Sequence, residues 1–317
     1  MQQAKQLLLL YGRLVRKSFS DLIWCGHPAK MRITTLTNSK NITFVNSMSE
    51  QIYSFRDPSF NPHQAYYYTL LIQIDAKSFS YAIVYDDDVL AWGANCNFAE
   101  LTNPQDLAEE LEATYKKVVI GLSSSVFTLV PDALFSKDQV ANYARLLDVK
   151  TDERVLAQSL DHRNHIIYKA DEKIIAAIQR FDLQNVVYLG KGWITAAALG
   201  NPGAEDLYLH TENGKAEFLY FKNGNIRFYN KFDYETEGDL GYYAAFVCEE
   251  LGLAPTDVQL KISGTLKPDD KFITSLSRFF PNINLFNPHL LNVPAQIDPQ
   301  QILTLAALSL CASSEVV

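Results

Sequence analysis

The feature of this sequence that most constrains its fold is a pattern of three short β-strands joined by tight turns, which occurs twice. The first copy begins at Leu70 and reads "LLIQIDAKSFSYAIVYDDDVLAWGANCNF". Its predicted strands are rich in β-branched and aromatic residues and are bounded by turn residues. Placing Asp75 against Glu212 also places Val89 against Ile226, so a constant offset of 137 residues relates the two copies. The repeat predicts two similar β-sheets.

The segments that follow each copy alternate between helix and strand. After the first copy we predict a helix opening at 103–104, a strand at 118–122, a strand ending at 130, a helix at 136–147, an irregular passage to 165, a helix at 171–181, a strand at 185–189 and a helix at 193–199. The second copy has strands at 207–211, 215–221 and 225–232, then helices at 238–251, 268–280 and 299–311 and strands at 258–263 and 283–286.

Hairpin-linked strands followed by alternating helices and strands imply sheets that are antiparallel first and parallel afterwards. The predicted fold class is therefore α/β, with duplicated βββαβαβα lobes and an insertion in the first lobe. Two such lobes in tandem also predict an interlobe cleft, where the hairpin turns of both sheets face each other.

A chain of 317 residues is long for a single core, and the sequence divides into three regions. Residues 1–47 carry several lysines and arginines against the single acid Asp21, and they show no sustained periodicity. We predict a basic N-terminal extension of uncertain structure. The alternative is an amphipathic membrane or partner anchor built on the apolar run that starts at Leu7. Lobe I is predicted at residues 48–203 and lobe II at residues 204–317.

Composition limits the classes of function. The net charge of −8 and the pI near 5.3 argue against a dedicated nucleic-acid-binding protein. The four cysteines form no CxxC pair, which is typical of buried thiols in a reducing compartment. His162 and His165 have no matching pair of ligands, so a solvated turn is favoured over a zinc site. No stretch approaches the ~20 apolar residues of a membrane-spanning helix. The cytoplasm is the expected location.

A duplicated βββαβαβα unit resembles the actin-like ATPase fold, which actin, Hsp70, sugar kinases and bacterial assembly proteins share. Three segments, "LLIQIDAKSFSYAIVYDDDVLA", "VVIGLSSSVFTLVPDALF" and "FLYFKNGNIRFYNKF", look like an uncharacterised bacterial family, a domain of unknown function with that fold. The resemblance covers residue 66 to the C-terminus. It implies a nucleotide site between the lobes, where two strand-turn-strand loops built on Asp-x-Gly hold the phosphates of Mg-ATP.

The three loops that the resemblance assigns to a nucleotide are incomplete in this sequence. The first loop keeps Asp75 and Ser78, but Lys77 stands where glycine is expected. The second loop lacks the strand-end aspartate, although Asn213-Gly214 can still form a tight turn. The third, expected under the adenosine, keeps one glycine of two in Ser263-Gly264-Thr265. Because glycine lets backbone N–H groups approach phosphates and the acid positions magnesium, these losses predict that the site is a remnant.

The candidate ligand-binding residues are Asp75, Lys77, Ser78, Asn213, Gly214, Ser263, Gly264 and Thr265. No catalytic residue, metal ligand or cofactor is assigned, and Mg-ATP is the alternative. We predict a vestigial, non-catalytic actin-like protein that acts as a binding or assembly scaffold for an unknown protein partner. The alternative is an active ATPase or kinase with atypical phosphate loops. A nucleic-acid interface would use the aromatic residues of the second strand triplet and its basic side chains, Lys215, Lys222, Arg227 and Lys231, and that signal is weak.

Overall fold

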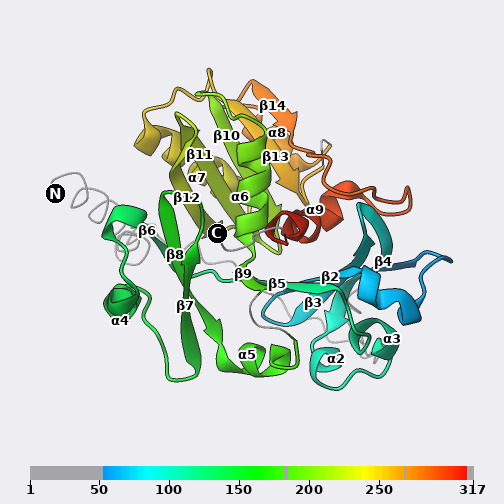
Figure 1. Cartoon of the computed structure of the whole chain (residues 1–317). Coiled ribbons are helices and arrows are strands. Elements are labelled where there is room, and N and C mark those ends of the chain that lie inside the picture. The colour runs from blue at the N-terminus through cyan, green and yellow to red at the C-terminus, as the bar shows by residue number, and fades with distance from the viewer. Residues whose placement is uncertain (1–52, 182–184, 268, 313–317) are drawn as a thin grey trace, which may run out of the picture. The chain divides into compact units, whose positions relative to one another are not determined.

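The computed structural model describes residues 53–181, 185–267 and 269–312 (Figure 1). The predicted N-terminal extension, residues 1–47, lies outside the described residues. The first large sheet has six strands in the order β1-β4-β3-β2-β5-β9. Their bounds are β1 (Tyr53–Arg56), β2 (Thr69–Ile74), β3 (Ser78–Tyr85), β4 (Asp88–Asn97), β5 (Lys117–Leu122) and β9 (Val186–Tyr188). A 3-10 helix, Pro62–Tyr67, precedes β2. The edge strand β1 was not predicted from the sequence.

The second large sheet has five strands in the order β12-β11-β10-β13-β14. Their bounds are β10 (Asp206–Glu212), β11 (Lys215–Lys222), β12 (Asn225–Asp233), β13 (Gln259–Gly264) and β14 (Asn282–Leu285). In both sheets the three hairpin-linked strands are antiparallel and the two later strands are parallel to the first of the three. The predicted α/β class and the mixed character of the sheets are confirmed.

The strand pairing follows the offset of 137 residues that the sequence predicts. Ile74 pairs with Phe79 in the first sheet, and Thr211 pairs with Ala216, at the equivalent positions of the second sheet. The next ladder of each sheet also departs from regular pairing at equivalent places. In the β3–β4 ladder the register shifts between residues 83 and 84, and in the β11–β12 ladder it shifts between residues 220 and 221. Such an irregularity bends and twists the strand that carries it, so the two lobes share this local shape.

The insertion in the first lobe forms a third sheet, with the order β6-β8-β7. Its strands are β6 (Phe127–Pro131), β7 (Glu153–Ser159) and β8 (Asn164–Asp171). The predicted irregular passage to residue 165 is therefore wrong, because this segment forms the β7–β8 hairpin. Its turn is fixed by the carboxylate of Asp161, which accepts hydrogen bonds from the backbone N–H groups of Arg163 and Asn164.

Two predicted helices of the first lobe differ in the structure. The chain forms α2 (Ala99–Thr102) and α3 (Ala108–Leu111), so residues 103–104 connect two short helices and do not open one. The Glu100 carboxylate accepts the N–H groups of residues 105, 106 and 107, and these bonds turn the chain. The helix predicted at 136–147 is reduced to 3-10 turns at Asp132–Leu134 and Lys137–Gln139 and to α4 (Val140–Ala144). The core beneath it is small, with three buried residues.

The remaining helices are α5 (Glu172–Ile178), α6 (Gly190–Leu199), α7 (Glu237–Leu251), α8 (Lys271–Leu276) and α9 (Pro299–Ala307), which continues as a 3-10 turn, Leu308–Cys311. A side chain caps the N-terminus of each of α5, α7, α8 and α9. The predicted helix at 268–280 is thus shorter, and its residue 268 lies outside the described residues.

Helix α6 contacts the second sheet through Trp193, whose ring lies 5.5 Å from that of His210 on β10. Helix α9 packs on β2 and β3 of the first sheet, and the two helices lie beside each other in Figure 1. Trp193 of α6 shares a core with Tyr208 of the second sheet. Ile302 and Leu305 of α9 share a core with Leu71 of the first sheet. As a result, α9 contacts strands of both large sheets: β2 and β3 of the first and β13 of the second.

Candidate functional site

The two hairpin turns that the sequence predicts to face each other are in direct contact. Strand β2 ends at Ile74 and is followed by Asp75, while Glu212 is the last residue of β10. The Gln73 side chain donates from Nε2 to Glu212 Oε1 at 3.0 Å, and the Asn213 side chain donates from Nδ2 to Asp75 Oδ2 at 3.4 Å. We call this region the lobe junction, and its residues are Gln73, Asp75, His210, Glu212, Asn213, Ser263, Gly264, Thr265, Gln300 and Thr304.

Two carboxyl groups with different protonation behaviour lie at the centre of the lobe junction. Burial and the nearby Glu212 charge raise the pKa of Asp75 to about 7. Burial by itself would also raise the pKa of Glu212, but the His210 ring, whose Nε2 lies 3.7 Å from Glu212 Oε2, and the hydrogen bond from Gln73 outweigh it and hold that pKa below its ordinary value. Gln73 is 3% exposed and donates to both carboxyl groups. Since two adjacent carboxylates repel each other, the first proton taken up by the pair resides on Asp75.

A chain of hydrogen bonds ends on the other oxygen of Glu212. The Trp193 indole can only donate, and it donates to Ser263 Oγ at 3.3 Å. Ser263 Oγ lies 3.1 Å from His210 Nδ1, and His210 Nε2–H donates to Thr304 Oγ1 at 3.1 Å. Thr304 completes the chain by donating to Glu212 Oε2 at 3.4 Å. The donor-only indole fixes the direction of the first bond, and the acceptor-only carboxylate fixes the directions of the two bonds made by Thr304.

The loop predicted to lie under an adenosine is bonded to the protein itself. The Gly264 N–H donates to Gln300 Oε1 at 2.8 Å, and the Thr265 N–H donates to the Thr211 carbonyl at 2.8 Å. Gly264 adopts a φ of +92°, and a Cβ atom there would lie 2.1 Å from the Thr211 carbonyl oxygen. The glycine is therefore required for close packing of β13 on β10. Both of these N–H groups are occupied by acceptors of the same chain.

Beside the lobe junction lies a second polar group, the Lys231 cluster, formed by Tyr188, Glu217, Tyr229 and Lys231. Lys231 Nζ lies 2.8 Å from Glu217 Oε1, and the two side chains are 5% and 12% exposed. Tyr229 donates to Glu217 Oε2 at 2.5 Å and accepts from the Tyr188 hydroxyl at 2.8 Å. Burial opposes the charge on Lys231, but Glu217 outweighs it and raises the pKa of the ammonium.

The ammonium of Lys231 also joins the two lobes. It donates to the backbone carbonyl of Ser124, which follows β5 of the first sheet, at 3.5 Å. Lys231 itself lies on β12, the edge strand of the second sheet. The Lys231 ammonium is therefore a buried cation between strands of the two lobes, and the Glu217 carboxylate neutralises its charge.

The raised pKa of Asp75 makes the stability of the fold depend on pH. An ordinary aspartate in an unfolded chain has a pKa of about 4, so Asp75 binds its proton more tightly in the folded state. Its contribution to stability is complete below about pH 4 and is lost as the pH rises through about 7. Asp75→Asn removes this loss. As the pH rises from about 4 to about 7, the free energy of unfolding of the variant should increase by about 2–4 kcal/mol relative to that of wild type. Urea unfolding of both proteins across this range measures it.

Asp57→Asn provides the matched control for that experiment. Hydrogen bonds from Ser59 lower the pKa of Asp57, which is the opposite direction. This control variant should therefore show no gain over wild type with rising pH. A constant difference between Asp75→Asn and wild type at all pH values would contradict the assigned protonation of Asp75.

The structure brings some of the predicted site residues together and leaves others apart. Asp75 and Asn213 are in contact, and Ser263, Gly264 and Thr265 are bonded to neighbours within the same region. Asn213 and Gly214 form the predicted tight turn, with φ values of +50° and +72°. Lys77 is exposed, and its ammonium has no partner among the described residues. Ser78 begins β3 and is half-buried.

Several residues of the lobe junction and the Lys231 cluster were missed. Gln73, His210 and Glu217 are polar residues inside otherwise apolar strands. A break in the apolar pattern of a buried strand indicates a buried polar partner, because an unpaired polar group is costly to bury. That signal was available in the sequence. The sequence contained no such signal for Gln300 and Thr304, because they lie on a helix that is distant in sequence from the other junction residues.

The basic residues of the second strand triplet do not form a free cationic surface. Lys215 pairs with Asp233, and Lys231 pairs with Glu217. Only Lys222 and Arg227 of the predicted set remain as exposed cations in the described meander. This arrangement leaves few unpaired basic side chains beside the aromatic residues of the described meander. In the part of the chain that the structure describes, no helix is both long and apolar enough to cross a membrane.

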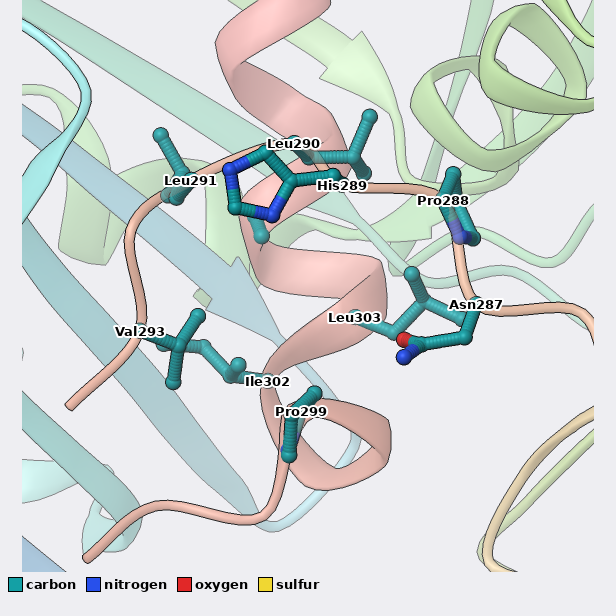
Figure 2. A pocket seen from close by; sticks show the side chains of 10 residues that line it. Asn287, Pro288, His289, Leu290, Leu291, Val293, Pro299, Ile302 and Leu303 are labelled. Carbon is teal, nitrogen blue, oxygen red and sulfur yellow. The ribbon is translucent and has the colours of Figure 1, made fainter. Parts of the chain in front are cut away.

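The residues of the lobe junction differ from those of a nucleoside triphosphate site in two respects. A triphosphate site needs free backbone N–H groups and a positive environment. Here the N–H groups of Gly264 and Thr265, in the loop expected under the adenosine, are occupied. In the first phosphate loop Lys77 stands where glycine is expected. One cavity of the described chain is lined by residues 131–133, 162–164 and 225–226. Another is lined by residues between 287 and 306 (Figure 2). Neither lining includes a residue of the lobe junction.

Comparisons with known proteins agree with this architecture. A family model described as "Protein of unknown function (DUF3822)" matches residues 57–283. A Bacteroides thetaiotaomicron protein with actin-like ATPase fold and unknown function is 19% identical, with a TM-score of 0.64 over 79% of this chain and 98% of that chain. The PilM-PilN type IV pilus biogenesis complex is 12% identical, with a TM-score of 0.50 over 77% of this chain and 97% of that chain. No curated protein matches the sequence. The fold is actin-like.

Proposed function

The chain belongs to this DUF3822 family of proteins of unknown function, and we propose that it is a non-catalytic actin-like protein that serves as a binding or assembly scaffold. One observation carries the proposal. The backbone N–H groups of the third loop and the carboxyl groups at the ends of the two phosphate-loop strands, Asp75 and Glu212, are bonded to other parts of the same chain. The bond from the Gly264 N–H to Gln300 Oε1, at 2.8 Å, is the clearest case.

Binding of a nucleotide would require the breaking of these internal bonds. Gln300 would have to release Gly264, and Gln73 and Asn213 would have to release the carboxyl groups of Glu212 and Asp75. A buried polar group that loses its partner costs about 1–3 kcal/mol. A triphosphate would also face the negative charge of Glu212. These costs oppose binding before any favourable contact forms.

A protein partner is the proposed ligand class. The structure of the PilM-PilN type IV pilus biogenesis complex, which shares the fold, is described as a complex of two proteins. This supports the use of the fold as a docking component. The second candidate, an ATPase or kinase with altered loops, is favoured by one observation, the two carboxyl groups of Asp75 and Glu212 on opposite sides of the junction, since carboxylates bind magnesium.

A thermal-shift and phosphate-release experiment separates the two candidates. With Mg-ATP or Mg-ADP, wild type should show no change in melting temperature and no phosphate release above the catalyst-free rate. A ligand present at 100 times its Kd would stabilise the fold by about 2.7 kcal/mol, which is readily seen. Asp75→Ala is the matched variant. Stabilisation or phosphate release that this variant abolishes would instead establish the ATPase or kinase candidate.

A further inference from the structure

The outer face of α7 carries aromatic side chains that the fold leaves exposed. The inner face of this helix, with Leu240, Ala244 and Val247, is fully buried in the core of the second lobe. On the opposite face Tyr242 is 65% exposed, and its ring stacks on that of Phe246 with the ring centres 6.2 Å apart. A surface helix is normally polar on the side away from the core, so α7 is unusual in presenting apolar side chains on both sides.

A third ring extends this apolar surface from the end of α8, the helix that packs on α7. The Phe279 side chain is 51% exposed. A Cβ atom on Gly241 would lie 3.9 Å from Phe279 Cε2, so the ring lies against the backbone of α7. We call Tyr242, Phe246 and Phe279 the aromatic face. Single exposed apolar side chains are common on proteins, but a group of them marks an interaction surface.

The last turn of α7 carries a local negative charge beside the aromatic face. Glu249 and Glu250 are exposed, and neither forms an ion pair among the described residues. Glu249 follows Tyr242 by seven residues, which places both on the same side of the helix. Carboxylates near a helix C-terminus are destabilised by the partial negative charge of that end. A cation bound at this position would relieve the repulsion.

Two basic residues near α7 lie toward its other end. Lys271 pairs with Glu237, the first residue of α7, at 2.8 Å. Arg278 adjoins Phe279, whose ring lies against α7 at Gly241, about two turns before the glutamates of the last turn. The surface therefore has three rings at its centre and a pair of carboxylates without a counterion at one end.

From these features we propose that the aromatic face binds a cationic amphipathic helix of a partner protein. The apolar side chains of that helix pack on the three rings, and its lysine or arginine side chains pair with Glu249 and Glu250. A helix fits because α7 presents its rings and its carboxylate at positions 242, 246 and 249, a spacing that a second helix laid along it can match. The inference rests on the proposed scaffold function, since it specifies the chemistry of the protein partner.

The charge of the surface argues against three other occupants. Nucleic acids and anionic lipids carry negative charge, so the glutamates of α7 repel them. A second copy docked through the same face would bring the acidic residues of two α7 helices together. This helix contains Glu237, Asp239, Glu249 and Glu250 and no lysine or arginine, and like charges placed opposite each other suppress association. A basic partner gains ion pairs at the same positions.

A pair of synthetic peptides tests the surface. The probe is a fluorescein-labelled amphipathic helix with leucine and tryptophan on one face and lysine beside them, and its control carries glutamate in place of each lysine. In anisotropy titrations with the full chain, the lysine peptide should bind saturably and the glutamate peptide should not. Tyr242→Ala should weaken binding by at least about tenfold, and Phe246→Ala serves if that variant does not fold. Tyr85→Ala, at an exposed tyrosine of the first lobe, should leave binding unchanged.

Reversal of the charge provides the second test. The double variant Glu249→Lys, Glu250→Lys should bind the glutamate peptide in preference to the lysine peptide, because the ion pairs are exchanged. The double variant Asp138→Lys, Asp152→Lys makes the same change in net charge at exposed positions of the insertion in the first lobe. This control should keep the preference of wild type for the lysine peptide.

Three results would overturn the proposed surface: no saturable binding of the lysine peptide, equal binding of both peptides, or binding that Tyr242→Ala and Phe246→Ala both retain. Sedimentation of wild type adds a fourth. A concentration-dependent dimer that Tyr242→Ala abolishes would show that a second copy occupies the aromatic face. The thermal-shift experiment with nucleotides tests the proposed function separately, so failure of one proposal is distinguishable from failure of the other.

Discussion

Replacement of Lys231 by methionine is expected to lower the free energy of unfolding by about 3–5 kcal/mol, since removing one partner of a buried ion pair leaves the other charge uncompensated. The Lys231 and Glu217 side chains are 5% and 12% exposed, and their charged atoms lie 2.8 Å apart. The methionine also removes the bond to the Ser124 carbonyl of the first lobe. Denaturant unfolding at neutral pH measures the change.

A matched pair on the same sheet provides the control for Lys231→Met. Lys215 pairs with Asp233, but these side chains are 35% and 78% exposed. Exposed pairs contribute about 0–1 kcal/mol, so Lys215→Met should have a small effect. The double variant Lys231→Met, Glu217→Gln should recover much of the lost free energy of unfolding, because it also removes the uncompensated charge of Glu217. Equal effects of Lys231→Met and Lys215→Met would contradict the larger contribution assigned to the buried Lys231–Glu217 pair.

The second large effect is expected at Gly264. Gly264→Ala should destabilise the protein by about 3 kcal/mol or more, because strain at a special backbone conformation and a steric clash act together. The new Cβ would lie 2.1 Å from the Thr211 carbonyl oxygen and 3.0 Å from the His210 ring, at a φ of +92°. Both neighbours are fixed by the β10–β13 ladder and by the junction, so neither can move without loss of other bonds. Thermal or urea unfolding measures the loss.

Gly224→Ala separates the clash at Gly264 from the backbone strain. Gly224 has a similar φ, +71°, with no atom within 4 Å of the position of an added Cβ. An L-residue in the left-handed region costs about 1–2 kcal/mol, and Gly224→Ala should lose only that amount. If the two alanine variants are equally destabilised, Gly264 is required for its φ alone, and the close packing of β13 on β10 does not explain it.

The fold was predictable from the sequence wherever local chemistry determines it. Asn223-Gly224 forms the predicted hairpin turn with φ values of +54° and +71°, which few residues other than asparagine and glycine adopt readily. The strands of both meanders were predicted within a few residues, because their apolar side chains and turn residues lie close together in sequence. The β7–β8 hairpin was missed because its turn depends on the Asp161 side chain, which a pattern of apolar residues does not reveal.

The candidate site was predictable only in part, for the same reason. Asp75 and Asn213 were identified by their places after equivalent strands, and they do meet. The bond between Gly264 and Gln300 joins residues 36 positions apart, and the bond between His210 and Thr304 joins residues 94 positions apart. These contacts depend on where α9 packs, which is a property of the assembled cores. The sequence predicted the helix but not its position between the two sheets.

The claim that the lobe junction is filled by the protein's own bonds is tested most directly by a crystal structure of the protein soaked with a non-hydrolysable ATP analogue and magnesium. We expect no ordered nucleotide between the lobes, with the Gly264 N–H still bonded to Gln300 and Gln73 still bonded to Glu212. An ordered nucleotide whose phosphates contact residues 75–78 or 212–214, with Gln300 displaced from Gly264, would contradict it.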